Sequence, residues 1–193
     1  MKSGFATRVK WALILCAAML LCALLYGAAS RIYYKKAYPL TYLEHVLEQN
    51  DYEILPNALV MAVIRTESGF NPLAQSSVGA RGLMQITEDT FHWAKWKRSA
   101  PPADSYEDLF DPRTNISYGM YILATHLSEY GSHELALCAY HAGRGSVNRW
   151  LADARYSQDG IALTSIPFDD TGRYVAKVKH TMEIYEKLYG GLE

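Results

Sequence analysis

Residues 60–69 read Val-Met-Ala-Val-Ile-Arg-Thr-Glu-Ser-Gly, and the fold is organised around this stretch. Val60, Val63 and Ile64 precede Glu67 by seven, four and three residues, which are spacings that share one face of an α-helix. Glu67 therefore continues an apolar stripe, although charged side chains usually lie on the opposite face. The stretch predicts a buried helix whose inner face ends in a glutamate.

The position of Glu67 at a helix end predicts a carboxyl group with a raised pKa. Gly69 follows it, and glycine commonly ends helices, so the carboxylate would lie near the negative end of the helix dipole. Burial and the dipole both disfavour the charged form and raise the pKa. Such a glutamate can act as a general acid near neutral pH. The alternative is a structural glutamate held by an arginine such as Arg81.

The N-terminal segment has the composition of a membrane span. Residues 11–29 contain no charged side chain, and about 20 apolar residues suffice to cross the hydrocarbon core as a helix. Basic residues flank the run on both sides, so the positive-inside rule leaves the orientation open. We expect residues 1–30 to form a retained single-span anchor and residues 31–41 a juxtamembrane linker. A signal peptide cleaved near residues 28–30 is the alternative.

The rest of the chain, residues 42–193, predicts one domain of short helices. Helix caps, prolines and glycines punctuate it, and no segment has the alternating pattern of a strand. Pro101 and Pro102 are expected to break the chain into a loop, and Thr171 is expected to cap the last helix. The expected helices lie at residues 42–49, 56–69, after Thr87, 111–131, 132–143, 147–151 and from 171 onward.

Composition excludes several functional classes. Three of the nineteen Lys and Arg residues precede the apolar run and the other sixteen stand against all twenty Asp and Glu residues, so the part from residue 31 onward has a formal charge of −4. With no basic block, this part is not expected to bind nucleic acid. The six histidines lack the spacing of a metal site, so we expect no metal and no cofactor.

Cys138 is expected to be a small buried hydrophobe, and a nucleophilic Cys138 with His141 is the alternative.

Several short blocks of sequence occur in a specific order. They are Glu-Ser-Gly-Phe-Asn-Pro at residues 67–72, Gly-Ala-Arg-Gly-Leu-Met-Gln at 79–85, Leu-Phe-Asp-Pro at 109–112, Ala-Tyr-His-Ala-Gly at 139–143, and Ile-Pro-Phe at 166–168 with Tyr174 and Val175. Together they resemble the soluble-lytic-transglycosylase (SLT) domain of peptidoglycan lytic transglycosylase family 1. The resemblance covers roughly residues 45–188 and implies an all-α, goose-type-lysozyme-like bundle with a glycan-binding cleft.

The resemblance also implies a reaction. In this family one glutamic acid protonates the β-1,4 glycosidic oxygen between N-acetylmuramic acid and N-acetylglucosamine, and a 1,6-anhydro ring closes without water. Glu67 matches that glutamate, so no second carboxylate is required, unlike in most glycosidases. Asp89 and Asp111 are nearby carboxylates, but a helix first turn and an N-cap explain them better.

The resemblance implies six substrate-contacting residues around Glu67: Ser68, Met84, Gln85, Tyr140, His141 and Tyr174. Each has a structural alternative, which is core packing for Met84 and the tyrosines, a capping amide for Gln85, and a plain helix end for Ser68. Gly79 and Gly82 are expected to let the backbone approach the helix of Glu67 or a sugar.

Two of the motifs depart from the family pattern, at three positions. His141 stands where the family usually has asparagine, so a titratable ring replaces an amide. In the last motif Asp170 replaces a glutamate and Gly172 an arginine, and Arg173 comes one residue late. A role of that arginine is therefore in doubt, whereas Glu67 and Tyr174 are kept.

The expected function is a membrane-anchored lytic transglycosylase with peptidoglycan glycan strands as its partner. Because the wall lies outside the membrane, the N-terminus would be cytoplasmic and the domain extracytoplasmic. A hydrolytic lysozyme on the same fold and a catalytically idle glycan-binding scaffold in an envelope assembly are the alternatives.

Overall fold

The computed structural model describes residues 2–50, 52, 54–98, 105–190 and 192. The chain divides into two compact units, Met1–Pro39 and Leu40–Glu193, which are described separately. The expected break at Pro101 and Pro102 lies outside the described residues.

The N-terminal unit is one long helix, α1, which spans Lys2–Ala37. Its part Leu13–Ala37, 25 residues, is long and apolar enough to cross a membrane. Large apolar side chains such as Leu20 and Leu24 are exposed within this unit. The helix continues through residues 31–37, so this part of the expected linker is helical.

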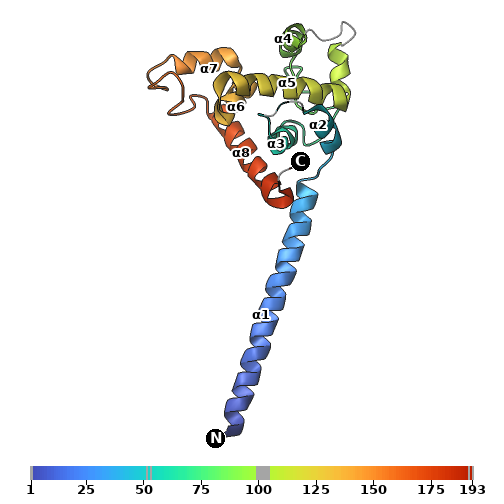
Figure 1. Ribbon diagram of the computed structural model, residues 1–193, viewed down its shortest axis with the longest axis vertical. Helices are drawn as coiled ribbons and strands as arrows, with labels where there is room; N and C mark the ends of the chain where they lie inside the picture. Colours follow the sequence, from blue (N-terminus) through green and yellow to red (C-terminus); the bar gives the residue numbers. More distant parts are fainter. Residues whose placement is uncertain (1, 51, 53, 99–104, 191, 193) are drawn as a thin grey trace. The chain divides into compact units, whose positions relative to one another are not determined.

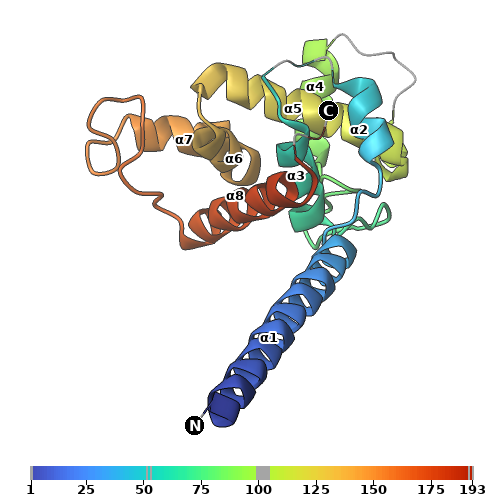
Figure 2. The same ribbon diagram turned by 60° about the horizontal axis from the view of Figure 1, so that its bottom comes forward.

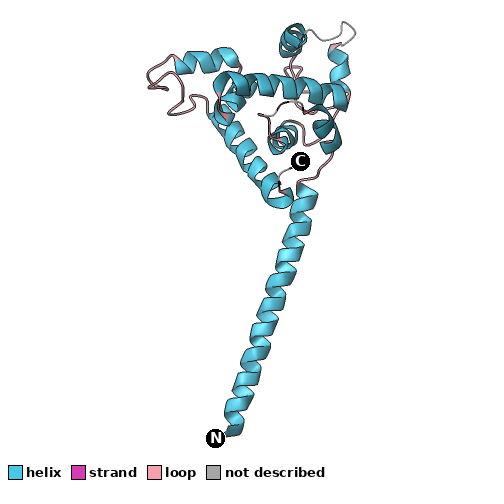
Figure 3. Ribbon diagram, in the orientation of Figure 1, coloured by secondary structure: helices cyan, strands magenta, loops and turns pink. Residues whose placement is uncertain are grey.

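The second unit is built from short helices (Figure 1). Secondary-structure colouring shows helices and loops, and no strand occurs in the described residues (Figure 3). The predicted all-α class is therefore confirmed. The elements are α2 (Leu43–Gln49), α3 (Asn57–Glu67), α4 (Glu88–Arg98), the 3-10 helix η1 (Tyr106–Phe110), α5 (Pro112–Tyr130), α6 (His133–Ala142), α7 (Arg144–Leu151) and α8 (Asp169–Tyr189).

Helix α3 is the core element of this unit. Residues 59–64 have no solvent exposure, as the apolar stripe predicts. Pro56 precedes the helix and presets the backbone for its first turn. Helix α3 packs against α8 and α2, and Figure 1 shows it nearly end-on between them. Figure 2 also shows α3 beside α8, and Glu67 is the last residue of α3.

Helix α5 begins and ends at its predicted cap residues, whereas α7 begins at Arg144, before the expected residue 147. Asp111 caps α5 by accepting a hydrogen bond from the Thr114 N–H at 2.8 Å, and α5 stops at Gly131 in the left-handed conformation, φ 63°. The prediction that Thr171 caps the last helix is wrong. Helix α8 begins at Asp169, so Thr171 lies within its first turn with 1 % of its surface exposed.

A loop between α3 and α4 is held in place by Asn115 of α5. The Asn115 side chain donates to the carbonyl oxygens of Arg81 (3.0 Å) and Leu109 (2.8 Å) and accepts from the Met84 N–H at 2.8 Å. Gly82 passes so close that an added Cβ would lie 2.1 Å from Asn115 Nδ2. Gly82 therefore serves the approach to Asn115 and Leu109, and the expected approach to a sugar stays a prediction.

Candidate active site

Glu67 is the last residue of α3, and its side chain is half-buried. Burial raises the pKa of Glu67 from 4.5 to about 7, whereas the Tyr174 hydroxyl and the positive charge of Lys177 act in the opposite direction. An acid with this pKa exchanges its proton readily near neutral pH. The raised pKa anticipated from the helical position is thus present, with burial as its main cause.

Two tyrosines from different helices flank Glu67. Burial raises the pKa of Tyr140 on α6 and of Tyr174 on α8 well above 10, and the negative charge of Glu67 raises both further. The Tyr174 hydroxyl lies beside the carboxyl group, but its geometry falls short of a regular hydrogen bond, and the buried oxygen has no other partner among the described residues. Its proton is therefore available to the Glu67 carboxylate.

Tyr140 also ties the site to the loop that precedes α4. Its hydroxyl donates to the carbonyl oxygen of Met84 at 2.8 Å. The Met84 side chain has no exposed surface and packs against Gly119 of α5. Of the two readings of Met84, the structure gives core packing for the side chain, while its backbone positions Tyr140.

The polar side chains of Ser68 and Gln85 are engaged locally. Ser68 Oγ donates to the carbonyl oxygen of Ile64 at 3.1 Å, one turn back in α3. Gln85 Nε2 donates to the carbonyl oxygens of Ala74 (3.1 Å) and Gly82 (2.9 Å). The Gln85 backbone has φ 47°, which is uncommon for a residue with a side chain. Its local amide bonds leave the side-chain oxygen for a ligand.

His141 contacts two residues of α8, Tyr174 and Thr171. Its ring stacks on Tyr174 with centroids 4.5 Å apart and an angle of 27° between the planes. Its Nδ1 lies 3.1 Å from the hydroxyl oxygen of Thr171. The site thus joins Glu67, Tyr140, His141 and Tyr174 at the meeting point of α3, α6 and α8.

A cavity of about 460 Å³ adjoins this meeting point. Gln85, Tyr140 and His141 line the cavity. Glu67 is not among the lining residues, but its charge acts on Tyr140, which is. The residues that line the rest of the cavity are Ile86, Thr87, Asp89, Thr90, Trp93, Ile122, His126, Ala139, Ala142, Gly143 and Arg144.

The cavity is also lined by an aromatic pair, Trp93 and His126, which was not predicted from the sequence. Trp93 stacks on His126 with centroids 6.0 Å apart. Burial lowers the pKa of His126 to about 4, so this ring is neutral at pH 7. Neither residue belongs to a recognisable motif, and the helical spacing of His126 with Ile122 on α5 was the one signal that could have placed it there.

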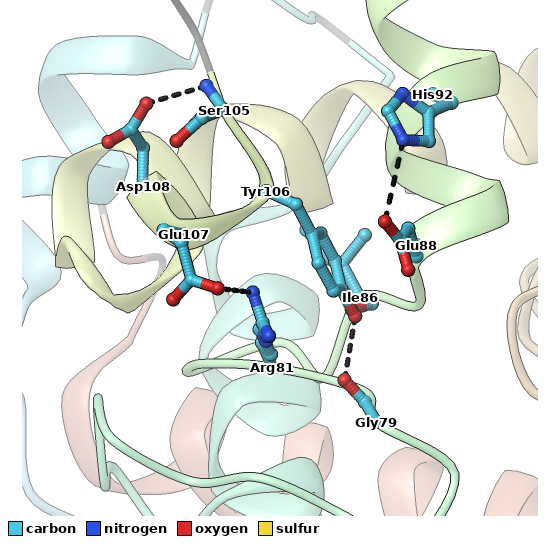
Figure 4. Close-up of polar contacts among 9 residues, drawn as sticks. All are labelled: Gly79, Arg81, Ile86, Glu88, His92, Ser105, Tyr106, Glu107 and Asp108. Atoms are coloured by element: carbon cyan, nitrogen blue, oxygen red, sulfur yellow. Dashed lines mark hydrogen bonds and ion pairs between the residues drawn. The ribbon is translucent and has the colours of Figure 1, made fainter.

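Arg81, the arginine considered as a partner of Glu67, interacts with residues of η1. Arg81 pairs with Glu107 at 2.8 Å and stacks over Tyr106, whose hydroxyl donates to the carbonyl oxygens of Gly79 and Ile86 (Figure 4). Arg81 is therefore engaged away from Glu67, and the alternative in which it neutralises that glutamate is not realised.

Asp89, Asp111 and Cys138 have structural roles or positions that explain them without a catalytic function. Asp111 is the N-cap of α5, and Asp89 lies in the first turn of α4 at the cavity wall. Burial raises the pKa of the Cys138 thiol to about 12, so the thiolate that a nucleophile requires is scarce at neutral pH. Cys138 is a buried apolar residue, as expected.

A family model supplies the decisive comparison. Residues 46–161 match the model of the transglycosylase SLT domain. The chain belongs to this family. The soluble lytic murein transglycosylase of Escherichia coli K12 is 35 % identical over 146 residues, which are 75 % of this chain and 23 % of that protein. The membrane-bound lytic murein transglycosylase C of Serratia proteamaculans is 30 % identical over 172 residues, with 76 % of this chain and 47 % of that protein covered.

Solved structures of SLT-domain proteins share the fold. The 70 kDa soluble lytic transglycosylase of Escherichia coli superposes with a TM-score of 0.71 at 32 % identity over 81 % of this chain and 26 % of that one. Its complex with bulgecin A gives 0.72 at 31 % identity over 83 % and 27 %. The lysozyme-like architecture is therefore confirmed. The chain spans about a quarter of the length of the soluble relatives.

Proposed function

We propose that this protein is a membrane-anchored lytic transglycosylase that cleaves the β-1,4 bond between N-acetylmuramic acid and N-acetylglucosamine in peptidoglycan. The observation that carries the proposal is the Glu67 carboxyl group, with a pKa near 7, held between Tyr140 and Tyr174 beside a cavity. A further relative supports the role of a glutamate. In the Slt protein of Pseudomonas aeruginosa, which superposes with a TM-score of 0.66 at 30 % identity over 80 % of this chain and 26 % of that one, an inactive variant carries glutamine in place of one glutamate.

Glu67 acts in turn as acid and base in the proposed reaction. The protonated carboxyl group gives its proton to the glycosidic oxygen, the C1–O bond breaks, and the 2-acetamido group of muramic acid stabilises the positive charge at C1. The Glu67 carboxylate then takes the proton of the C6 hydroxyl as O6 bonds to C1 and closes the 1,6-anhydro ring. Glu67 ends protonated, so no water and no second carboxylate are consumed.

The surrounding residues support these steps. The Tyr174 hydroxyl can donate to the carboxylate that forms after the first proton transfer, and Lys177 favours the same charge. Tyr140, Gln85 and His141 line the cavity where the glycan would lie. Ser68 contributes by a hydrogen bond to the carbonyl oxygen of Ile64 at the end of α3. Met84 contributes through its carbonyl oxygen, which accepts the hydrogen bond of the Tyr140 hydroxyl.

We further propose that α1 is a retained anchor with a cytoplasmic N-terminus and an extracytoplasmic domain. The length and apolar composition of Leu13–Ala37 support a span, and the membrane-bound relative supports a membrane location. The substrate lies outside the membrane, which fixes the proposed orientation. A reporter enzyme that is active only outside the cytoplasm, fused after Glu193, tests the topology. Activity in the membrane fraction supports it, and release of the fusion as a soluble protein shortened at residues 28–30 indicates a cleaved signal.

The reaction is tested by incubating the full chain with purified peptidoglycan and analysing the products by mass spectrometry. Fragments that end in 1,6-anhydro-muramic acid, lighter than reducing ends by one water, are expected. Glu67→Gln should release them at least about 100-fold more slowly, since general acid–base groups contribute this much or more. Glu183→Gln, which alters an exposed acid on α8, is the matched control.

Other outcomes point to the rival functions. Reducing ends in place of anhydro ends would make the protein a hydrolytic lysozyme. Glycan binding without release of any fragment, from pH 5 to pH 9, would leave a scaffold as the function.

A further inference from the structure

We propose that Thr171 is a positioning residue that fixes His141 as a directed hydrogen-bond donor to the glycan. Thr171 lies in the first turn of α8 and is almost fully buried. Its hydroxyl oxygen is 3.1 Å from His141 Nδ1 in the last turn of α6. His141 itself is exposed and lines the cavity, so the contact joins a buried hydroxyl to a ring that a ligand can reach.

The direction of this hydrogen bond follows from the hydroxyl proton. A buried O–H needs an acceptor, and among the described residues the Thr171 hydroxyl contacts His141 Nδ1 alone. If Nδ1 carried the proton and donated to Thr171, the hydroxyl proton would be buried without an acceptor. Thr171 therefore donates to Nδ1. Neutral imidazole has one N–H, so the proton of His141 lies on Nε2.

A second contact fixes the plane of the ring. His141 stacks on Tyr174, which follows Thr171 by three residues and lies on the same face of α8. Thr171 thus sets the rotation of the ring and Tyr174 supports its face. The Nε2 edge is the part left to meet a ligand in the cavity that Tyr140 also lines.

The matching ligand group is an uncharged oxygen acceptor on a sugar, which is an acetamido carbonyl or a hydroxyl oxygen. This step rests on the proposed function, because the ligand is the glycan. The Thr171 hydroxyl makes the imidazole present a donor at a fixed place, which is a task an amide at this position could also perform. An imidazole without this hydrogen bond would exchange between its two tautomers, so that Nε2 would be a donor in one and an acceptor in the other.

The tautomer is tested by nitrogen NMR of the full chain in detergent micelles at pH 8, with the His141 signals assigned by their loss in His141→Asn. We expect an unprotonated Nδ1 and a protonated Nε2. Thr171→Val should mix the two tautomers, and Thr171→Ser, which keeps the hydroxyl, should restore the first. Thr181→Val changes a threonine of similar burial in the same helix and should leave the His141 signals unchanged. A wild-type ring protonated on Nδ1 would overturn the proposal.

The effect on the ligand is tested by titration calorimetry with a tetramer of N-acetylglucosamine, in the Glu67→Gln background so that no turnover occurs. Thr171→Val is expected to weaken binding about 3- to 10-fold, as loss of one hydrogen bond does, and Thr171→Ser less than about 2-fold. With His141→Ala already present, Thr171→Val should have no further effect, since the two residues act through one contact.

Three binding results would contradict the proposal. The first is that Thr171→Val weakens tetramer binding equally in the presence and in the absence of His141. The second is that Thr171→Val leaves the affinity unchanged, and the third is that the Glu67→Gln parent does not bind the tetramer. A wild-type protein that releases no anhydro ends, but keeps the tautomer and the coupled binding, would instead sink the transglycosylase reaction and leave the role of Thr171 standing.

Discussion

Glu67→Gln should make the folded domain more stable at neutral pH while it slows fragment release at least about 100-fold. The pKa of Glu67 is about 7 in the folded protein, against 4.5 for an ordinary glutamate. Between these two values the folded state holds a proton that the unfolded state has lost. The free energy of unfolding therefore falls as pH rises through this window. Glutamine keeps the shape of the side chain and removes the titration.

The size of the effect follows from the pKa difference. Each pKa unit corresponds to about 1.4 kcal/mol, so the difference between 4.5 and about 7 means that the carboxylate costs the folded state about 3.5 kcal/mol well above pH 7. Below pH 4.5 the group is protonated in both states and this cost is absent. The difference in unfolding free energy between the variant and the wild type should thus grow by about 3 kcal/mol from pH 4 to pH 8.

Urea unfolding of the full chain in detergent at constant ionic strength measures this difference. Other titrating groups affect both proteins alike and cancel in the comparison. Glu183→Gln, which replaces an exposed acid, should show a difference that does not change with pH. A Glu67→Gln difference that is equally flat would refute the argument, because it would mean that burial does not raise the pKa of Glu67.

Three further substitutions test other parts of the site. In Tyr174→Phe the phenol that lowers the pKa of Glu67 is lost, so the fall in kcat/KM at high pH should move upward from about pH 7, as a pH–rate profile can measure. Gly82→Ala would place Cβ 2.1 Å from Asn115 Nδ2 at φ +73°, and should destabilise the domain by about 3 kcal/mol or more in urea unfolding. Cys138→Ala should leave anhydro-product release within about 2-fold, because the thiol is buried and protonated.

The sequence predicted the helices that local signals define. The stripe before Glu67, the cap at Asp111 and the glycine at 131 each determine their helix through short-range geometry, and each is found in place. Thr171 was misassigned because a threonine near a helix start suits both a cap and a first-turn position. Its partner, His141, lies 30 residues away on another helix, and local rules do not report such pairings.

Glu67, the proposed catalytic residue, was predictable because a charged side chain on the apolar face of a helix is unusual. The flanking tyrosines were predictable through motifs alone, since fifteen tyrosines in the chain offer no local distinction. Trp93 and His126 were missed for a physical reason. They line the cavity because α4 and α5 meet there, which is a property of tertiary packing that neither helix displays in its own sequence.

The opposing effects on the pKa of Glu67 suit the proposed reaction, in which this residue acts first as an acid and then as a base. An acid with an ordinary pKa would be deprotonated before it could protonate the glycosidic oxygen, and one with a far higher pKa would form too unstable a carboxylate to wait for the C6 proton. Burial raises the pKa, while the Tyr174 hydroxyl and Lys177 limit the rise to about 7. Both protonation states are then close in free energy near neutral pH, which is the condition that a mechanism with one carboxyl group imposes on that group.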